Sequence, residues 1–180
     1  MSLNLVHIFN QRAVDQPNHP LILGPAKTDV VSYGAFQQHI RQLAAALDAS
    51  GIRAGMNIGL HYPNGTMYIA YTYAIWSCGA CVTPIPVELA AEEKQNLLHH
   101  IAMDAVISAE HLVNALNAVA ITSPEALPEQ ACRLTVKAFR TPPPELTALN
   151  PAFIRFTSGT TSDAKGVVLS HETIFERIQA

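Results

Sequence analysis

Apolar residues recur at helical spacing in two stretches near the start of the chain. The first stretch predicts an amphipathic helix over Asn4–Asp15. The second predicts a helix over Tyr33–Ser50, with Ser32 as its N-terminal cap and Gly51 at its end. Between these helices, short apolar runs predict two strands, Leu21–Leu23 and Val30–Ser32.

From residue 58 onward, short apolar strands alternate with longer helices. The predicted elements are strand Ile58–Tyr62, helix Thr66–Cys78, strand Cys81–Ile85, helix Ala91–Ala102 and strand Ala105–Ser108. Asn64-Gly65-Thr66 is interpreted as a helix-entry turn. This alternation is typical of a parallel sheet with helical crossovers. We therefore predict an α/β fold: a layered αβα arrangement with a mostly parallel sheet.

The remainder of the chain is less regular. Glu110–Arg140 is a variable region without a predicted element, and Pro142–Pro144 is expected to exclude a helix or a central strand. The final elements are predicted as strand Phe153–Thr157, a polar loop, strand Gly166–Leu169 and a helix capped by Ser170.

Composition limits the class of protein. The chain has 180 residues, 49% of them hydrophobic and 14% charged, which fits one compact domain and excludes disorder for most of its length. The net charge of −3 argues against a dedicated nucleic-acid binder. The charge is uneven, because Met1–Cys132 carries −5 and Arg133–Ala180 carries +2. An anion is therefore expected at the C-terminal quarter.

Membrane insertion and export are not predicted. The uninterrupted apolar stretch Met67–Cys78 is about 12 residues, or roughly 18 Å of helix, against about 30 Å of hydrocarbon core. The N-terminus lacks a basic segment of the kind that begins a signal peptide. We expect a cytoplasmic location and no membrane span.

Three cysteines do not make a disulfide framework for a chain of this length. Cys78 and Cys81 have the spacing of a redox dithiol, but they follow an apolar helix, whereas that chemistry needs the first cysteine at a helix N-terminus. Buried packing is the favoured interpretation. We predict no metal site, because Cys132 alone supplies no second ligand pair for zinc and the eight histidines lack metal spacing.

The loop between the last two predicted strands carries the candidate chemistry. Its sequence is Thr157-Ser158-Gly159-Thr160-Thr161-Ser162-Asp163-Ala164-Lys165-Gly166. Hydroxyls and backbone N–H groups donate hydrogen bonds, glycine allows close approach and lysine adds a positive charge, so a polyphosphate is the expected ligand. The segment differs from a Walker loop, because Lys165-Gly166 precedes a strand rather than a helix. A solvated Ser/Thr-rich loop is the alternative interpretation on composition alone.

Residue order favours the first interpretation. The C-terminal part of the chain resembles the phosphate-loop motif of the adenylate-forming (AMP-binding) superfamily, which includes acyl-CoA synthetases. The matching residues are Phe153–Thr161, then Lys165-Gly166-Val167, then Ser170-His171. Weaker similarity extends upstream: Ser32-Tyr33 at a helix start, Pro63-Asn64-Gly65 after a strand, and Cys78–Ile85. The chain 1–180 is thus identified as the N-terminal portion of an adenylate-forming domain, ending just after the phosphate loop.

The resemblance implies a role for each matching residue. ATP phosphates would be contacted by Thr157, Ser158, Gly159, Thr160, Thr161 and Lys165, and Gly166 would form the turn that folds the loop over the nucleotide. The family usually has glycine at the place of Ser162 and proline at the place of Ala164, so loop shape is expected to differ while the donors remain. His171, at the end of the matching stretch, is either a simple helix N-terminal residue or a supporting residue of the site.

The resemblance also implies a reaction. A carboxylic acid and ATP, with Mg²⁺, would give an acyl-adenylate and pyrophosphate, and coenzyme A would then take the acyl group. No catalytic residue is expected within these 180 residues, because the family places the acid pocket and the catalytic lysine downstream. The isolated chain is expected to be inactive, and without the C-terminal remainder its apolar surface is expected to favour self-association. The alternative is a short non-catalytic α/β module that binds a nucleotide or a partner protein.

Overall fold

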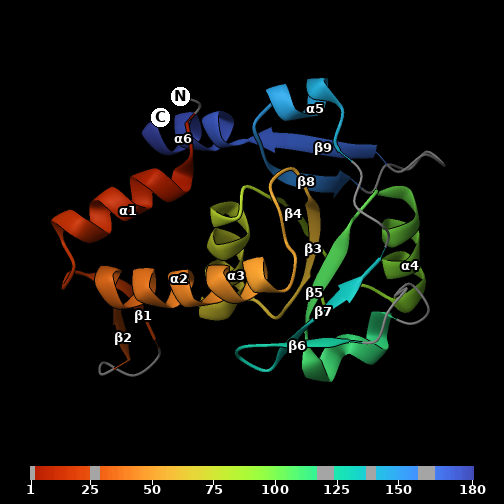
Figure 1. Ribbon diagram of the computed structural model, residues 1–180, viewed down its shortest axis with the longest axis horizontal. Helices are drawn as coiled ribbons and strands as arrows, with labels where there is room; N and C mark the ends of the chain where they lie inside the picture. The colour runs from red at the N-terminus through yellow and green to blue at the C-terminus, as the bar shows by residue number, and fades with distance from the viewer. Residues whose placement is uncertain (1–2, 25–28, 117–123, 137–140, 158–164) are drawn as a thin grey trace.

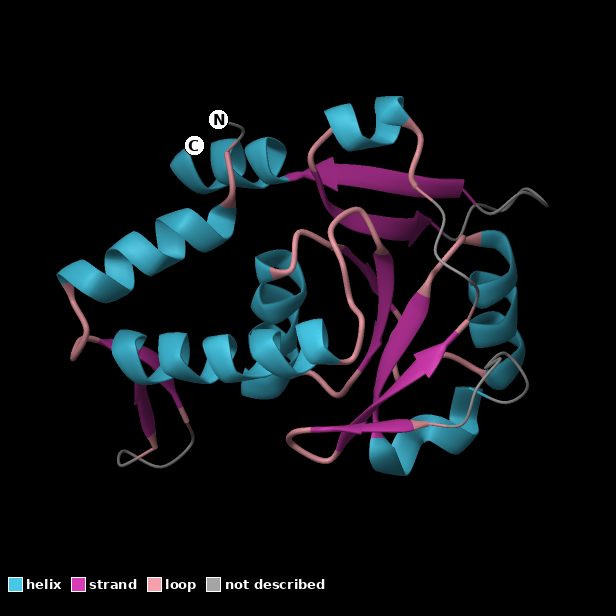
Figure 2. Cartoon of the chain, in the orientation of Figure 1, coloured by secondary structure: helices cyan, strands magenta, loops and turns pink. Residues whose placement is uncertain are grey.

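A seven-stranded sheet forms the centre of the molecule (Figures 1 and 2). The computed structural model describes residues 3–24, 29–116, 124–136, 141–157 and 165–180. The strands of the sheet are β3 (Asn57–His61), β4 (Cys81–Pro84), β5 (Ala105–Ala109), β6 (Glu125–Leu127), β7 (Ala131–Thr135), β8 (Pro151–Thr157) and β9 (Lys165–Ser170). Their spatial order is β6-β7-β5-β3-β4-β8-β9.

The four central strands β5, β3, β4 and β8 run parallel, whereas the outer pairs are antiparallel. The parallel centre confirms the predicted layered α/β fold. It follows from the chain order, because β3 and β4 are joined by a helical crossover, as parallel neighbours require. A separate two-stranded antiparallel sheet contains β1 (Pro20–Leu23) and β2 (Val30–Ser32).

Helices cover both faces of the sheet (Figure 1). Helices α2 (Tyr33–Ala49) and α3 (Thr66–Ser77) lie on one face, and α4 (Ala91–His100) with the 3₁₀ helix η1 (Glu110–Leu116) lies on the other. The Ser32 hydroxyl accepts a hydrogen bond from the Ala35 N–H at the start of α2, and Gly51 follows that helix with φ +94°. Both predicted boundary residues of this helix are thus confirmed.

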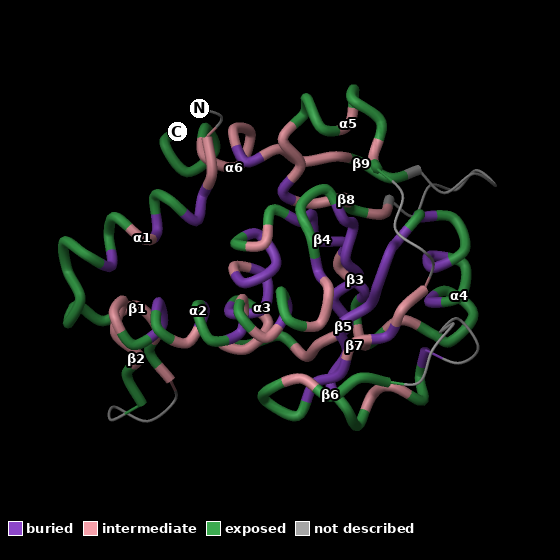
Figure 3. The backbone as a smooth tube through the Cα atoms, in the orientation of Figure 1, coloured by how far each residue is buried: buried purple, intermediate pink, exposed green. Residues whose placement is uncertain are grey.

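Two hydrophobic cores lie on opposite faces of the sheet, and the central strands are buried between them (Figure 3). The larger core packs helix α1 (Leu5–Asp15), α2 and α3 against the sheet. Trp76 belongs to this core, donating from Nε1 to the Ala152 carbonyl at 2.8 Å and contacting the ring of Phe153. The smaller core packs α4 against Val106 and Ile85.

The region between residues 110 and 150 contains elements that the sequence did not predict. Glu110–Leu116 forms η1, and β6 and β7 extend the sheet beyond β5. The expectation that Pro142–Pro144 excludes a helix was wrong, because Pro144 is the first residue of helix α5 (Pro144–Ala148). Proline is tolerated there since the first helical N–H has no partner within the helix.

The two ends of the chain meet beside helix α6 (His171–Gln179), at the upper left of Figure 1. The Asn150 side-chain amide donates both to the Leu3 carbonyl at 2.6 Å and to the Glu172 carboxylate at 2.8 Å. These contacts tie the N-terminal segment to the last helix. Within the residues that the structure describes, no helix has both the length and the apolar character needed to cross a membrane.

Candidate functional site

The candidate site lies at the edge of the sheet where the parallel strands end. Strands β3, β4 and β8 point the same way, so their carboxyl ends, at His61, Pro84 and Thr157, lie at one edge. Open α/β sheets bind ligands at this edge, because the loops that follow the strands gather there. The predicted phosphate loop begins here, at Thr157.

The two ends of that loop are paired in the sheet. Thr157 and Lys165 form the last pair of the β8–β9 ladder. Ser158, Gly159, Thr160 and Thr161, the other predicted contacts, lie outside the described residues. Gly166 was expected to form a turn, but it lies within β9 opposite Phe156. A Cβ at position 166 would stand 3.1 Å from the Ile154 Cγ2 atom, so close packing against β8 explains a glycine at this position.

A polar hollow of about 210 Å³ opens at the same edge. Its lining residues come from the segments that follow β3 and β4 and from β8: Tyr62, Asn64, Tyr68, Pro84, Ile85, Pro86, Val87, Glu88 and Arg155. Burial raises the pKa of Tyr68, while the charge of Arg155 acts in the opposite direction. We call this cavity the polar hollow.

A larger hollow of about 560 Å³ lies between α4 and the β8–β9 pair. Its lining is mainly apolar: Pro84, Pro86, Leu89, Glu93, Asn96, Leu97, Arg155, Phe156, Val167 and Leu169. Val167, in the edge strand β9, is 44% exposed. Arg155, Pro84 and Pro86 line both hollows, so the two cavities adjoin each other.

Two buried titratable residues, His61 and Lys94, adjoin this edge. His61, the last residue of β3, is fully buried, and its Nδ1 lies 3.1 Å from the Ser108 hydroxyl of β5. Burial, reinforced by the charges of Lys94 and His111, lowers the pKa of His61 to about 4. The imidazole is therefore neutral at pH 7. The Lys94 amine is also buried and donates to the Val87 carbonyl at 2.8 Å, fastening the segment between β4 and α4.

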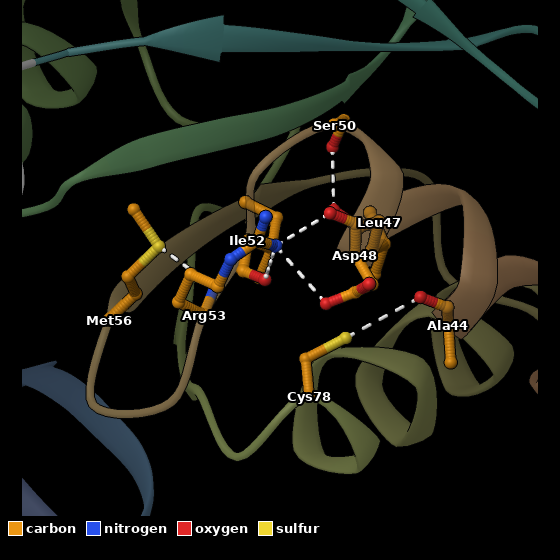
Figure 4. A network of polar contacts seen from close by, with 8 residues as sticks. All are labelled: Ala44, Leu47, Asp48, Ser50, Ile52, Arg53, Met56 and Cys78. Atoms are coloured by element: carbon orange, nitrogen blue, oxygen red, sulfur yellow. Dashed lines mark hydrogen bonds and ion pairs between the residues drawn. The ribbon is translucent and has the colours of Figure 1, made fainter.

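The cysteines are placed for packing. The Cys78 thiol contacts the Ala44 carbonyl at 3.6 Å, beside the turn held by Arg53 and Asp48 (Figure 4). Burial raises the pKa of Cys78 to about 11 and that of Cys81 to about 12. Both are thiols at neutral pH, whereas redox chemistry requires a thiolate. The packing interpretation is supported.

His171 lies far from the loop. The residue before it, Ser170, pairs with Pro151 at the start of β8, so it stands at the opposite edge from Thr157. The His171 ring is buried against Trp76 with centroids 5.0 Å apart. Of the two interpretations of His171, the helix N-terminal packing residue is therefore the one that the structure supports.

Sequence reasoning missed the residues of the polar hollow. Asn64 and Tyr68 are far from Arg155 in the chain, and only folding brings them together. One signal was present: Arg155 is the only charged residue in the apolar run 151–157. The structure shows this residue exposed on β8, where it lines the polar hollow.

The comparisons with known proteins agree with this architecture. Residues 9–180 match the family model described as AMP-binding enzyme, and the chain belongs to this family. The sulfoacetate–CoA ligase of Cupriavidus necator is 26% identical over 181 residues, covering 94% of this chain and 35% of that enzyme. The long-chain-fatty-acid–CoA ligase FadD13 of Mycobacterium tuberculosis is 28% identical over 179 residues, covering 95% of this chain and 36% of that enzyme.

Solved structures show the same fold. The inhibitor-bound N-terminal domain of FACL13 from Mycobacterium tuberculosis superposes with a TM-score of 0.74 at 24% identity, over 97% of this chain and 46% of that one. The chain thus has the fold of that N-terminal domain. It spans about a third of the length of the two curated relatives described above.

Proposed function

We propose that this chain is the phosphate-loop portion of an acyl-activating ligase of the acyl-CoA synthetase type. The main support for this proposal is the sequence of residues Thr157–Thr161 followed by Lys165-Gly166. This segment follows the carboxyl end of a parallel strand. Hydroxyls, backbone N–H groups and an ammonium suit the oxygens of a polyphosphate. This donor set therefore fits the triphosphate of ATP.

The reaction has two steps. A carboxylate oxygen of the acid bonds to the α-phosphorus of ATP while the bond to the β-phosphate oxygen breaks, which releases pyrophosphate. The thiol of coenzyme A then attacks the acyl carbon, and AMP leaves. Mg²⁺ would be bound chiefly through the phosphate oxygens, and we assign it no residue of this chain.

The residues of this chain act on the leaving group. Lys165 and the hydroxyls of Thr157, Ser158, Thr160 and Thr161 would bind the β- and γ-phosphates and stabilise the negative charge that develops on pyrophosphate. The backbone N–H of Gly159 would add a further donor. None of these groups attacks the acid or moves a proton, so we infer that the 180-residue chain alone binds nucleotide but does not turn it over.

The test is pyrophosphate release from ATP over a panel of carboxylic acids, with and without coenzyme A. The full-length protein is expected to release pyrophosphate with at least one acid, and the 180-residue chain with none. Acid-dependent release by the 180-residue chain would contradict the inferred inactivity. Absence of release by the full-length protein with every acid would contradict the ligase proposal.

A further inference from the structure

The polar hollow contains a set of hydrogen-bond donors that the proposed reaction does not use. Arg155, Tyr68 and Asn64 all line it, Arg155 and Asn64 being exposed and Tyr68 half-buried, and the side chain of each can donate to an oxygen. The Tyr62 hydroxyl, a fourth donor, already donates to the Glu129 carbonyl at 2.9 Å. The remaining three come from β8, from α3 and from the turn before α3, and they line one cavity.

The position of Arg155 links this cavity to the loop. Arg155 lies in β8 two residues before Thr157, where the strand ends. Two residues of a strand span about 7 Å, so the Arg155 backbone lies within that distance of the point where the loop begins. A ligand whose phosphates reach the start of the loop is therefore near the hollow.

Helix α3 adds favourable electrostatics. It begins at Thr66 after Gly65, which has no side chain to accept from the first N–H groups. The positive end of this twelve-residue helix adjoins the hollow, because Asn64 and Tyr68 flank the helix start. Glu88 is the single carboxylate in the lining, it is exposed, and it forms no ion pair with Arg155 in the described part of the chain.

We propose that Arg155, Tyr68 and Asn64 form an oxyanion subsite that binds a phosphate group of the ligand held by the loop. This inference rests on the proposed function, because it takes the loop to be a polyphosphate site. Arg155 supplies the charge and a two-pronged donor, and Tyr68 and Asn64 supply neutral donors. Glu88 weakens the binding through its negative charge.

Binding of inorganic pyrophosphate to the 180-residue chain tests the subsite by isothermal titration calorimetry at fixed ionic strength. Arg155→Gln is expected to weaken binding about tenfold or more, since a charge-assisted bond is lost. Tyr68→Phe should weaken it about three- to tenfold. Glu88→Gln should strengthen it about two- to fivefold, because a repulsive charge is removed.

Arg177→Gln is the matched control, since it makes the same charge change on the exposed end of α6 and should alter affinity less than about twofold. If Arg155→Gln does no more than this control, the subsite is overturned. If Arg155→Gln fails to fold by circular dichroism, Arg155→Lys replaces it: a loss of about threefold or more supports the forked contact, and an unchanged affinity refutes it.

Lys165→Ala separates this inference from the proposed function. If Lys165→Ala weakens pyrophosphate binding while Arg155→Gln and Glu88→Gln have no effect, the loop binds phosphate and the subsite is wrong. If neither Lys165→Ala nor Arg155→Gln has an effect, the loop is not a phosphate site and both proposals fail.

Discussion

Acidification is expected to destabilise this protein chiefly through His61, because burial lowers its pKa to about 4, and the lowered pKa of the buried His171 acts in the same direction. The His61 side chain is fully buried, and its Nδ1 is 3.1 Å from the Ser108 hydroxyl. That hydroxyl lies 3.1 Å from the Ala109 carbonyl and donates to it, so Nδ1 donates to the serine. Nε2 then remains an unprotonated nitrogen without a partner among the described residues. Burial is the main cause that disfavours a proton there, and the electrostatic effects of Lys94 and His111 act in the same direction.

The size of the effect follows from linkage. The folded pKa is about 4 and the ordinary value is 6.5, so the unfolded chain takes up the proton first as pH falls. Stability is fully present above pH 6.5 and is lost as the pH falls from there towards 4. At about 1.36 kcal/mol per pKa unit, the loss between pH 7.5 and pH 5 is about 2 kcal/mol.

Urea unfolding at pH 7.5, 6.5, 5.5 and 5 measures this loss. His61→Asn is the comparison, because an asparagine amide can still donate to Ser108 but does not titrate. The variant should start less stable and lose about 2 kcal/mol less than the parent chain on going to pH 5. Equal pH dependence in the two proteins would refute the assignment of the acid sensitivity to His61.

Three further substitutions test the packing by urea unfolding at pH 7.5. Gly59→Ala should destabilise by about 2 kcal/mol, because a Cβ there would stand 2.7 Å from the Met103 sulfur and 2.8 Å from the Ile85 Cδ1 atom; an unchanged midpoint would contradict the tight packing. Trp76→Phe should cost about 2 kcal/mol by leaving the buried Ala152 carbonyl without its donor, and a cost below about 0.5 kcal/mol would argue against that bond. Gln130→Gly should stabilise by about 1 kcal/mol, since Gln130 has φ +53°, and destabilisation would show that its side chain matters more than its backbone.

The regular part of the fold could be predicted from the sequence. The cap Ser32, the helix end at Gly51 and the alternation of strands and helices from residue 57 are encoded locally, within a few residues of each other. The prediction for Pro142–Pro144 was wrong, because proline is excluded from the interior of a helix but not from its first position. The strands β6 and β7 were missed since β6 has only three residues, two of them exposed.

The candidate site was predictable only in part. The loop residues stand in one continuous run, so their order could be interpreted directly, and their flanking strands are confirmed. The polar hollow depends on tertiary structure, because Tyr68 reaches Arg155 only when α3 and β8 share an edge of the sheet. His61 and Ser108 meet for the same reason: β3 and β5 are neighbours in space although 47 residues separate the pair.

Exchange of labelled pyrophosphate into ATP by the full-length protein tests the central claim most directly, because it reports adenylate formation on the phosphate loop. With an accepted carboxylic acid, exchange should occur and should fall about a hundredfold or more in Lys165→Ala, as expected when a group that stabilises developing charge is removed. Arg177→Ala, on the exposed end of α6, should exchange at the rate of the parent protein. Exchange that Lys165→Ala leaves unchanged, or no exchange with any acid, would contradict the account.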